Sequence, residues 1–78
     1  MKLLVVDDDL ELNEILTFTL RRAGFIVISA YDGVSALELW RAEQPDLILL
    51  DVNIPRLDGF GVLQQLRRET ATPVIMLT

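Results

Sequence analysis

The 78-residue sequence contains no cysteine and no histidine. Without thiols, the chain can form neither disulfide bonds nor a thiolate metal site. Without imidazoles, it has neither histidine metal ligands nor a catalytic triad that depends on histidine. Any metal site in this chain must therefore be built from oxygen atoms. Such hard ligands favour Mg²⁺, Mn²⁺ or Ca²⁺ over zinc and copper.

Long hydrophobic runs are also missing. The longest purely apolar runs have four residues, whereas a transmembrane helix needs about 20, so we expect no membrane span. The N-terminus lacks the regions of a signal peptide, and together with the absence of cysteine this leads us to expect a cytoplasmic location. The net charge of −5 disfavours non-specific binding to nucleic acid, so we expect no direct nucleic-acid contact from these residues.

What the sequence does contain is four short apolar runs separated by segments with helical spacing. The runs are rich in Val, Ile and Leu and do not alternate strictly with polar residues, which is typical of strands buried on both faces. Apolar runs that alternate with helices indicate βαβ units and an α/β fold with a parallel sheet. The predicted strands lie at about 2–6, 25–29, 46–50 and 73–77.

Three helices are expected between these strands. Asp8 and Glu11 have the spacing of a capping box at the start of the first helix, and Gly24 can end it. The predicted apolar face of this helix consists of Leu12, Ile15, Leu16, Thr19 and Ala23.

The second helix is expected to start after Asp32-Gly33 and to end before Pro45, because proline cannot continue a helix. The third should start at Asp58-Gly59, and its predicted apolar positions are Phe60, Val62, Leu63 and Leu66. Three helices on four strands would leave one face of the sheet thinly covered and one edge strand unprotected.

Two of the predicted strands end in carboxylates. The first runs into Asp7, Asp8 and Asp9, and the third runs into Asp51. If these strands are neighbours about 4.8 Å apart, the carboxylates meet at one rim of the sheet, where ligands of open α/β folds bind. Carboxylates that close repel one another, and a divalent cation resolves the conflict. The sequence therefore predicts a site for Mg²⁺, with Mn²⁺ or Ca²⁺ as substitutes.

Each of these aspartates also has a purely structural interpretation. Asp8 and Asp9 could serve only as helix N-caps, each worth about 1 kcal/mol. Asp58 precedes a glycine at a helix start, and we interpret it as a cap. Asp51 is harder to explain in this way because the third helix starts seven residues later, although a solvated acid at a strand end remains an alternative.

With both acidic strand ends identified, the chain resembles the receiver domain of bacterial two-component response regulators. The similarity covers residues 1–78 and rests on LLVVDDD at 3–9, YDGVSALEL at 31–39, DLILLDVNIPRLDG at 46–59 and PVIMLT at 73–78. A small departure is Ile54, where many members have methionine. The resemblance implies a flavodoxin-like sheet with helices on both faces and strand order 2-1-3-4.

The resemblance also implies a role for each site residue. Asp51 would accept a phosphoryl group from a phosphohistidine on a sensor histidine kinase. Asp8, Asp51 and the backbone carbonyl of Asn53 would ligate Mg²⁺, and Asp7 would hold the metal through water. Thr78 would bond a phosphoryl oxygen and switch an output domain, most often a DNA-binding transcriptional regulator. Apart from self-catalysed acceptance of a phosphoryl group at Asp51 in the full-length parent, the resemblance implies no enzyme activity.

Compared with this family, the chain lacks its last third. A fourth helix, a fifth strand that ends in a lysine and a fifth helix are absent, so residues 1–78 are expected to form an incomplete receiver domain. That lysine pairs with the phosphoryl group. Lys2 lies at the wrong end of its strand to replace it. Arg56 lies in the loop and could reach the site, but nothing in the sequence supports that role. We therefore expect impaired phosphotransfer, and self-association through the unprotected edge.

Two other functions fit parts of the pattern. The first is a receiver-like interaction module that is not phosphorylated, although such a module has no need for Asp7, Asp8, Asp51 and Thr78 together. The second is a hydrolase with a strand-end aspartate, as in dehalogenase-like phosphatases. These enzymes need a second aspartate two residues after the nucleophile, and this chain has Asn53 there.

Overall fold

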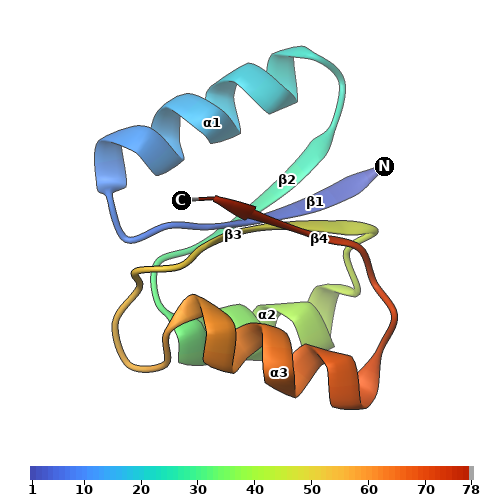
Figure 1. Ribbon diagram of the computed structural model, residues 1–78. Helices are drawn as coiled ribbons and strands as arrows, with labels where there is room; N and C mark the ends of the chain where they lie inside the picture. The colour runs from blue at the N-terminus through green and yellow to red at the C-terminus, as the bar shows by residue number, and fades with distance from the viewer. Residues whose placement is uncertain (78) are drawn as a thin grey trace.

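A computed structural model describes residues 1–77 of the chain as three layers, with a parallel sheet between helices (Figure 1). Strands and helices alternate along the chain as predicted. In chain order they are β1 (Lys2–Val6), α1 (Leu10–Arg22), β2 (Ile26–Ala30), α2 (Gly33–Glu43), β3 (Leu47–Asp51), α3 (Gly59–Glu69) and β4 (Val74–Leu77).

All four strands are parallel, in the order β2-β1-β3-β4. The α/β class, the parallel sheet and the strand order 2-1-3-4 are therefore confirmed. The helix α1 covers one face of the sheet, while α2 and α3 lie side by side on the other (Figure 1). The strands β2 and β3 each begin and end one residue later than predicted, so Asp51 is the last residue of β3.

The hydrophobic core lies between the sheet and the pair α2 and α3. Because side chains alternate along a strand, every second residue of each strand points to this side. The central strands contribute Leu4, Val6, Ile48 and Leu50, which are almost fully buried. The helices contribute Ala36, Leu37, Trp40, Val62 and Leu66.

The predicted apolar face of α1 does not face the sheet. Leu12, Ile15, Thr19 and Ala23 are exposed, and only Leu16 of that set is half-buried. The residues that α1 buries against the sheet are Asn13 and Thr17. This prediction was wrong because the positions that contact the sheet are occupied by polar side chains, which bond to the sheet and to each other. Periodicity alone therefore selected the wrong stripe of the helix.

A similar correction applies to one residue of α3. Val62 and Leu66 are buried as predicted, but the side chain of Phe60 is 62% exposed. Residues two positions apart in a helix are about 200° apart around its axis, so Phe60 points away when Val62 points to the sheet.

The face of the sheet that carries α1 is incompletely covered, as the sequence predicts. The helix lies over β1 and β2, and Ile75 of β4 is 51% exposed. Within residues 1–77, β4 is an edge strand that pairs only with β3. Among residues 1–77, no helix has the length and apolar character needed to cross a membrane.

Candidate functional site

The site lies at the carboxyl end of the two central strands. In the register of β1 and β3, Val6 is paired with Leu50, so Asp7 and Asp51 are the next residues on adjacent strands. One ligand oxygen from each of Asp7, Asp8 and Asp51 lies within 4.8 Å of the other two. Asp51 therefore converges with Asp7 and Asp8, from which it is distant in the sequence, because parallel strands end at the same rim of the sheet.

The turn from β1 into α1 gives each aspartate a different task. The backbone N–H of Asp9 donates a hydrogen bond to Asp7 Oδ1 at 3.0 Å. Asp9 Oδ1 accepts from the N–H of Leu12 at 3.1 Å, so Asp9 is the N-cap of α1. The predicted capping box of Asp8 and Glu11 is wrong, because the bond to Asp7 tightens the turn and starts the helix one residue later. Asp8 is consequently left exposed and without a capping role.

Asp7 is the most buried of the three carboxylates, with a residue exposure of 3%. Burial raises the pKa of Asp7 above its ordinary value, and the hydrogen bond from the Asp9 N–H lowers it in part. The negative charges of Asp51, Asp8 and Asp9 raise the pKa of Asp7 further. The ionised cluster is therefore electrostatically unfavourable in the protein alone, and a bound cation would offset this repulsion.

Replacing Asp7 with asparagine should stabilise the metal-free protein at neutral pH. The folded protein keeps the Asp7 proton to a higher pH than the unfolded chain, for which the ordinary value is 3.8. The free energy of unfolding must then fall as the pH rises from that value through the raised pKa. We expect Asp7→Asn to flatten this part of the pH profile and to add roughly 0.5–2 kcal/mol at pH 7.

Urea unfolding of both proteins between pH 4 and pH 8, without divalent cations, would measure this effect. Glu11→Gln is the matched control, because it removes one carboxylate from the same helix start at an exposed position. Equal pH profiles for the wild type and Asp7→Asn would contradict the expectation.

Asp51 is half-buried, and its side chain has one weak partner. The N–H of Asn53 donates to Asp51 Oδ1 at 3.4 Å. Among the ion pairs of residues 1–77, none involves a carboxylate of the cluster. The oxygens of Asp51 thus face the rim of the sheet and are not neutralised by a neighbouring side chain.

The loop between β3 and α3 is anchored on both sides by glycines. The N–H of Gly59 donates to the carbonyl of Val52 at 2.9 Å, and the N–H of Gly33 donates to the carbonyl of Pro55 at 3.1 Å. A Cβ at Gly59 would overlap the carbonyl of Asp51, and a Cβ at Gly33 would overlap the carbonyl of Leu57. Neither position has room for a side chain, so these glycines allow the loop to lie directly against the two helix starts.

The other predicted features of this loop have clear structural roles. Asp58 Oδ1 accepts from the N–H of Gly61 at 2.8 Å, which confirms Asp58 as the N-cap of α3. Arg56 lies in the left-handed region with a φ of 71°. Its guanidinium is 3.5 Å from the carboxylate of Asp32, the N-cap of α2. Arg56 is therefore paired with Asp32 and not with the acidic cluster.

Two further cations of residues 1–77 are paired away from the site. Lys2 pairs with Glu43, consistent with its position at the amino end of β1, and Arg41 pairs with Glu69. The described residues hence provide three converging carboxylates, none of which is in an ion pair. That donor set fits a hard divalent cation, which takes carboxylate oxygens and keeps several waters.

Asn13 is a residue of this region that the sequence analysis missed. It is a fully buried residue of α1, and its Nδ2 donates to the backbone carbonyls of Asp7 at 3.0 Å and Ala30 at 3.1 Å. The available signal was an asparagine four residues after the N-cap, on the same helical stripe as Thr17. Apolar periodicity does not indicate such a position, because the residue there is polar.

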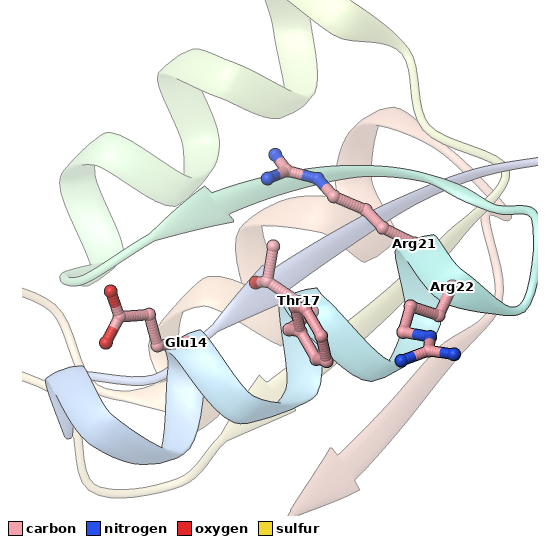
Figure 2. Close-up of a pocket in the computed structure, with 5 residues that line it drawn as sticks. Glu14, Thr17, Arg21 and Arg22 are labelled. Atoms are coloured by element: carbon pink, nitrogen blue, oxygen red, sulfur yellow. The ribbon is translucent and has the colours of Figure 1, made fainter.

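A shallow hollow on the surface lies elsewhere, along α1. It is lined by Glu14, Thr17, Phe18, Arg21 and Arg22 (Figure 2). Figure 2 shows Arg21 reaching from α1 toward β2, where its guanidinium donates to the carbonyl of Val27 at 3.0 Å. The hollow shares no residue with the acidic cluster, and Arg21 serves to close part of the β2 edge.

Residues 3–78 match the family model described as the response regulator receiver domain. A "Probable transcriptional regulator ycf27" from Cyanophora paradoxa is 48% identical over 77 residues, which cover 99% of this chain and 32% of that protein. The protein of the same name from Porphyra purpurea is 49% identical over 77 residues, with the same coverage of 99% and 32%. The chain thus spans about a third of the length of these curated relatives.

Solved structures give the same result for the fold. The N-terminal domain of a response regulator receiver protein from Methanoculleus marisnigri JR1 has a TM-score of 0.92 at 38% identity, covering 99% of this chain and 65% of that chain. The BeF3-activated N-terminal receiver domain of RstA from Klebsiella pneumoniae has a TM-score of 0.96 at 32% identity, covering 100% of this chain and 67% of that chain.

Proposed function

The chain belongs to the response regulator receiver domain family, and from this premise we propose that Asp51 is the acceptor of a phosphoryl group. The observation that carries the proposal is the convergence of Asp7, Asp8 and Asp51, whose ligand oxygens lie within 4.8 Å of one another at the carboxyl end of the sheet. Asp51 ends a buried strand and has no capping role, so its carboxylate is free to react. The alternative of a module that is not phosphorylated gives no reason for this cluster.

The proposed reaction is one displacement at phosphorus. A carboxylate oxygen of Asp51 attacks the phosphorus of a phosphohistidine on a sensor histidine kinase. The new P–O bond forms as the P–N bond breaks, and the released imidazole nitrogen takes a proton from solvent. The product is an aspartyl phosphate, of the kind carboxylate nucleophiles form. Asp51 carries the product, so the chain is not an enzyme with turnover in the ordinary sense.

The remaining site residues position this reaction. Asp8, Asp51 and the backbone carbonyl of Asn53 would hold Mg²⁺, and Asp7 would hold it through water. The bound cation supplies charge neutralisation for the phosphoryl oxygens. Mn²⁺ or Ca²⁺ would be accepted at the same oxygens. Thr78 lies outside the described residues, and its predicted bond to a phosphoryl oxygen stays a prediction.

The partners follow from the family. We infer a sensor histidine kinase as phosphodonor, a cytoplasmic location for this chain and, in a longer parent protein, an output domain. Curated relatives are named as transcriptional regulators, so a DNA-binding output is the proposal. Residues 1–78 themselves would make no nucleic-acid contact, in keeping with their net charge of −5.

Residues 1–78 correspond to an incomplete receiver domain in this proposal. The family's lysine has no counterpart near the cluster, since Lys2 pairs with Glu43 and Arg56 pairs with Asp32. One source of transition-state charge stabilisation is therefore missing, so phosphoryl acceptance by this chain should be slow compared with a complete receiver domain.

Intact-mass measurement tests the proposed function. The chain is incubated with acetyl phosphate and Mg²⁺, and a gain of one phosphoryl group (HPO₃) is expected, growing slowly over the incubation. The same incubation with EDTA should give no gain, because the three carboxylates would repel the donor. A mass that never changes in the presence of Mg²⁺, in protein shown to be folded, would reject the function.

Self-association is the second proposal for this chain, through the β4 edge. The carbonyls of Pro73 and Leu77 accept from β3, so the backbone groups of Val74 and Met76 point to the open side. No charged residue occurs in 70–77 to discourage pairing. By contrast, Arg21 covers a carbonyl of the β2 edge. A second copy is therefore expected to pair along β4.

Sedimentation equilibrium would measure this association. Ile75→Lys should weaken it by at least about tenfold, equivalent to about 1.4 kcal/mol, because it places a charge beside the open edge. Ile26→Lys, at an exposed position on the opposite edge strand, is the matched control and should leave the association unchanged. A wild-type monomer at high concentration would refute the proposal.

A further inference from the structure

The side chain of Asn13 is held in one orientation by its surroundings. It is fully buried, and both N–H groups of its amide are used, one on the carbonyl of Asp7 and one on the carbonyl of Ala30. Its Oδ1 accepts from Thr17 Oγ1 at 3.2 Å, and that hydroxyl also bonds Ser29 Oγ at 2.9 Å. A flipped amide would point its oxygen at two carbonyl oxygens, so the observed orientation is the one the site permits.

This network fixes the peptide that joins two of the proposed metal ligands. The N–H of Asp7 donates to the carbonyl of Ala30 at 3.1 Å, and the carbonyl of Asp7 accepts from Asn13. Both backbone groups of Asp7 are thus anchored, one to β2 and one to α1. The plane of the Asp7–Asp8 peptide cannot rotate without breaking a buried hydrogen bond. The directions of both carboxylates depend on that plane.

Asn13 supplies hydrogen bonds that an apolar residue in its place could not. The position contacts the sheet, and without the amide the carbonyl of Asp7 would lose its side-chain partner at a free-energy cost. Asn13 thereby extends the pairing of β1 and β2 beyond their last residues, up to the edge of the acidic cluster. The last of these hydrogen bonds is to the carbonyl of Asp7, whose side chain belongs to the acidic cluster.

From these contacts we infer that Asn13 is a positioning residue for a divalent cation at Asp7, Asp8 and Asp51, acting through the Asp7 carbonyl. The inference rests on the proposed function, because it assumes that the cluster binds the cation. Groups behind metal ligands typically contribute 10–100-fold to metal affinity. Asn13 would do so without touching the metal.

The test compares two variants of the buried network in the 78-residue chain. Asn13→Leu removes both bonds to backbone carbonyls, while Thr17→Val removes hydroxyl bonds and keeps those of the Asn13 amide. Mn²⁺ affinity is measured by the loss of the free-ion electron paramagnetic resonance signal, and folding by urea unfolding followed through the only tryptophan, Trp40. We expect 10–100-fold weaker Mn²⁺ binding for Asn13→Leu and less than about a threefold change for Thr17→Val.

A folded Asn13→Leu protein with wild-type affinity would overturn the inference, and so would equal losses in both variants, since equal losses would indicate general loosening. If the wild type itself binds no Mn²⁺, the proposed function fails together with the inference. If the wild type binds Mn²⁺ and Asn13→Leu binds it equally well, the inference alone fails. Asp51→Asn provides the reference for a ligand that touches the metal.

A second measurement needs no variant and covers the case in which Asn13→Leu does not fold. In a Mg²⁺ titration followed by nuclear magnetic resonance, the side-chain NH₂ signals of Asn13 should move along the same binding curve as the backbone N–H of Asp8. The side-chain NH₂ of Gln65, which bonds Glu69 on α3, should not move. A stationary Asn13 signal at saturating Mg²⁺ would overturn the inference.

Discussion

Replacing Asp51 with asparagine is expected to abolish the phosphoryl adduct completely. The amide keeps the shape of the side chain and can still accept from the N–H of Asn53, so the loop should be retained. A neutral amide oxygen is not a nucleophile toward phosphorus, however, and cannot form the P–O bond. Intact mass after incubation with acetyl phosphate and Mg²⁺ measures the effect.

The same variant should lose most of the stabilisation by Mg²⁺. A ligand present at ten times its Kd stabilises the folded state by about 1.4 kcal/mol, which raises Tm by roughly 6–11 °C in a domain of this size. Removing one of three carboxylates weakens binding and reduces this shift. At the same time, it relieves repulsion within the cluster, so the metal-free variant should be at least as stable as the wild type.

Asp58→Asn is the matched control for Asp51→Asn. Asp58 lies in the same loop, but its carboxylate caps α3, and asparagine is an equally good N-cap. The control should keep the phosphoryl adduct, the response to Mg²⁺ and the unfolding midpoint. A phosphoryl adduct on Asp51→Asn, or its loss in Asp58→Asn, would contradict the assignment of the two aspartates.

The second large effect is expected at Gly59. An added Cβ would overlap the carbonyl oxygen of Asp51 and the Cα of Val52, which are backbone atoms that cannot rotate away. We expect Gly59→Ala to lower the free energy of unfolding by about 3 kcal/mol. Because the overlap is with the backbone of Asp51 itself, the variant should also weaken Mg²⁺ binding. Urea unfolding followed through the fluorescence of buried Trp40 measures the stability.

Gly61→Ala is the control, two residues further along the same helix. There the added Cβ would meet the side chain of Leu57, which can change rotamer, and alanine gains about 1 kcal/mol of helix propensity over glycine. The control should therefore unfold at or above the wild-type midpoint. Equal midpoints for Gly59→Ala and Gly61→Ala would show that α3 can move away from β3, contrary to the structure.

Most of the architecture could be read from the sequence because it depends on local chemistry. Four Val-, Ile- and Leu-rich runs separated by helical segments predict a parallel α/β sheet. No end of an observed strand differs by more than one residue from the predicted end. Gly24 adopts a φ of 100° after α1, as expected for a helix-ending glycine. The caps Asp32 and Asp58 were predictable for the same reason, since a cap bonds its own helix.

The two incorrect predictions for α1 have one cause. Periodicity predicts that the apolar stripe of α1 faces the sheet, whereas Asn13 and Thr17 occupy the contact. Spacing predicts a capping box at Asp8, whereas Asp9 caps the helix because Asp7 accepts its N–H. In both cases the deciding partner is a backbone group or carboxylate on another element. Periodicity and spacing along one helix contain no information about such partners.

By itself, the sequence determined the element types, the parallel sheet and the presence of acids at two strand ends, because these follow from side-chain chemistry within short segments. The tertiary structure decided how those acids are used. The register of β1 and β3 brings Asp7, Asp8 and Asp51 together, and burial raises the pKa of Asp7. The buried amide of Asn13 then links this rim to α1. These relations depend on distances between elements, which form only when the chain folds.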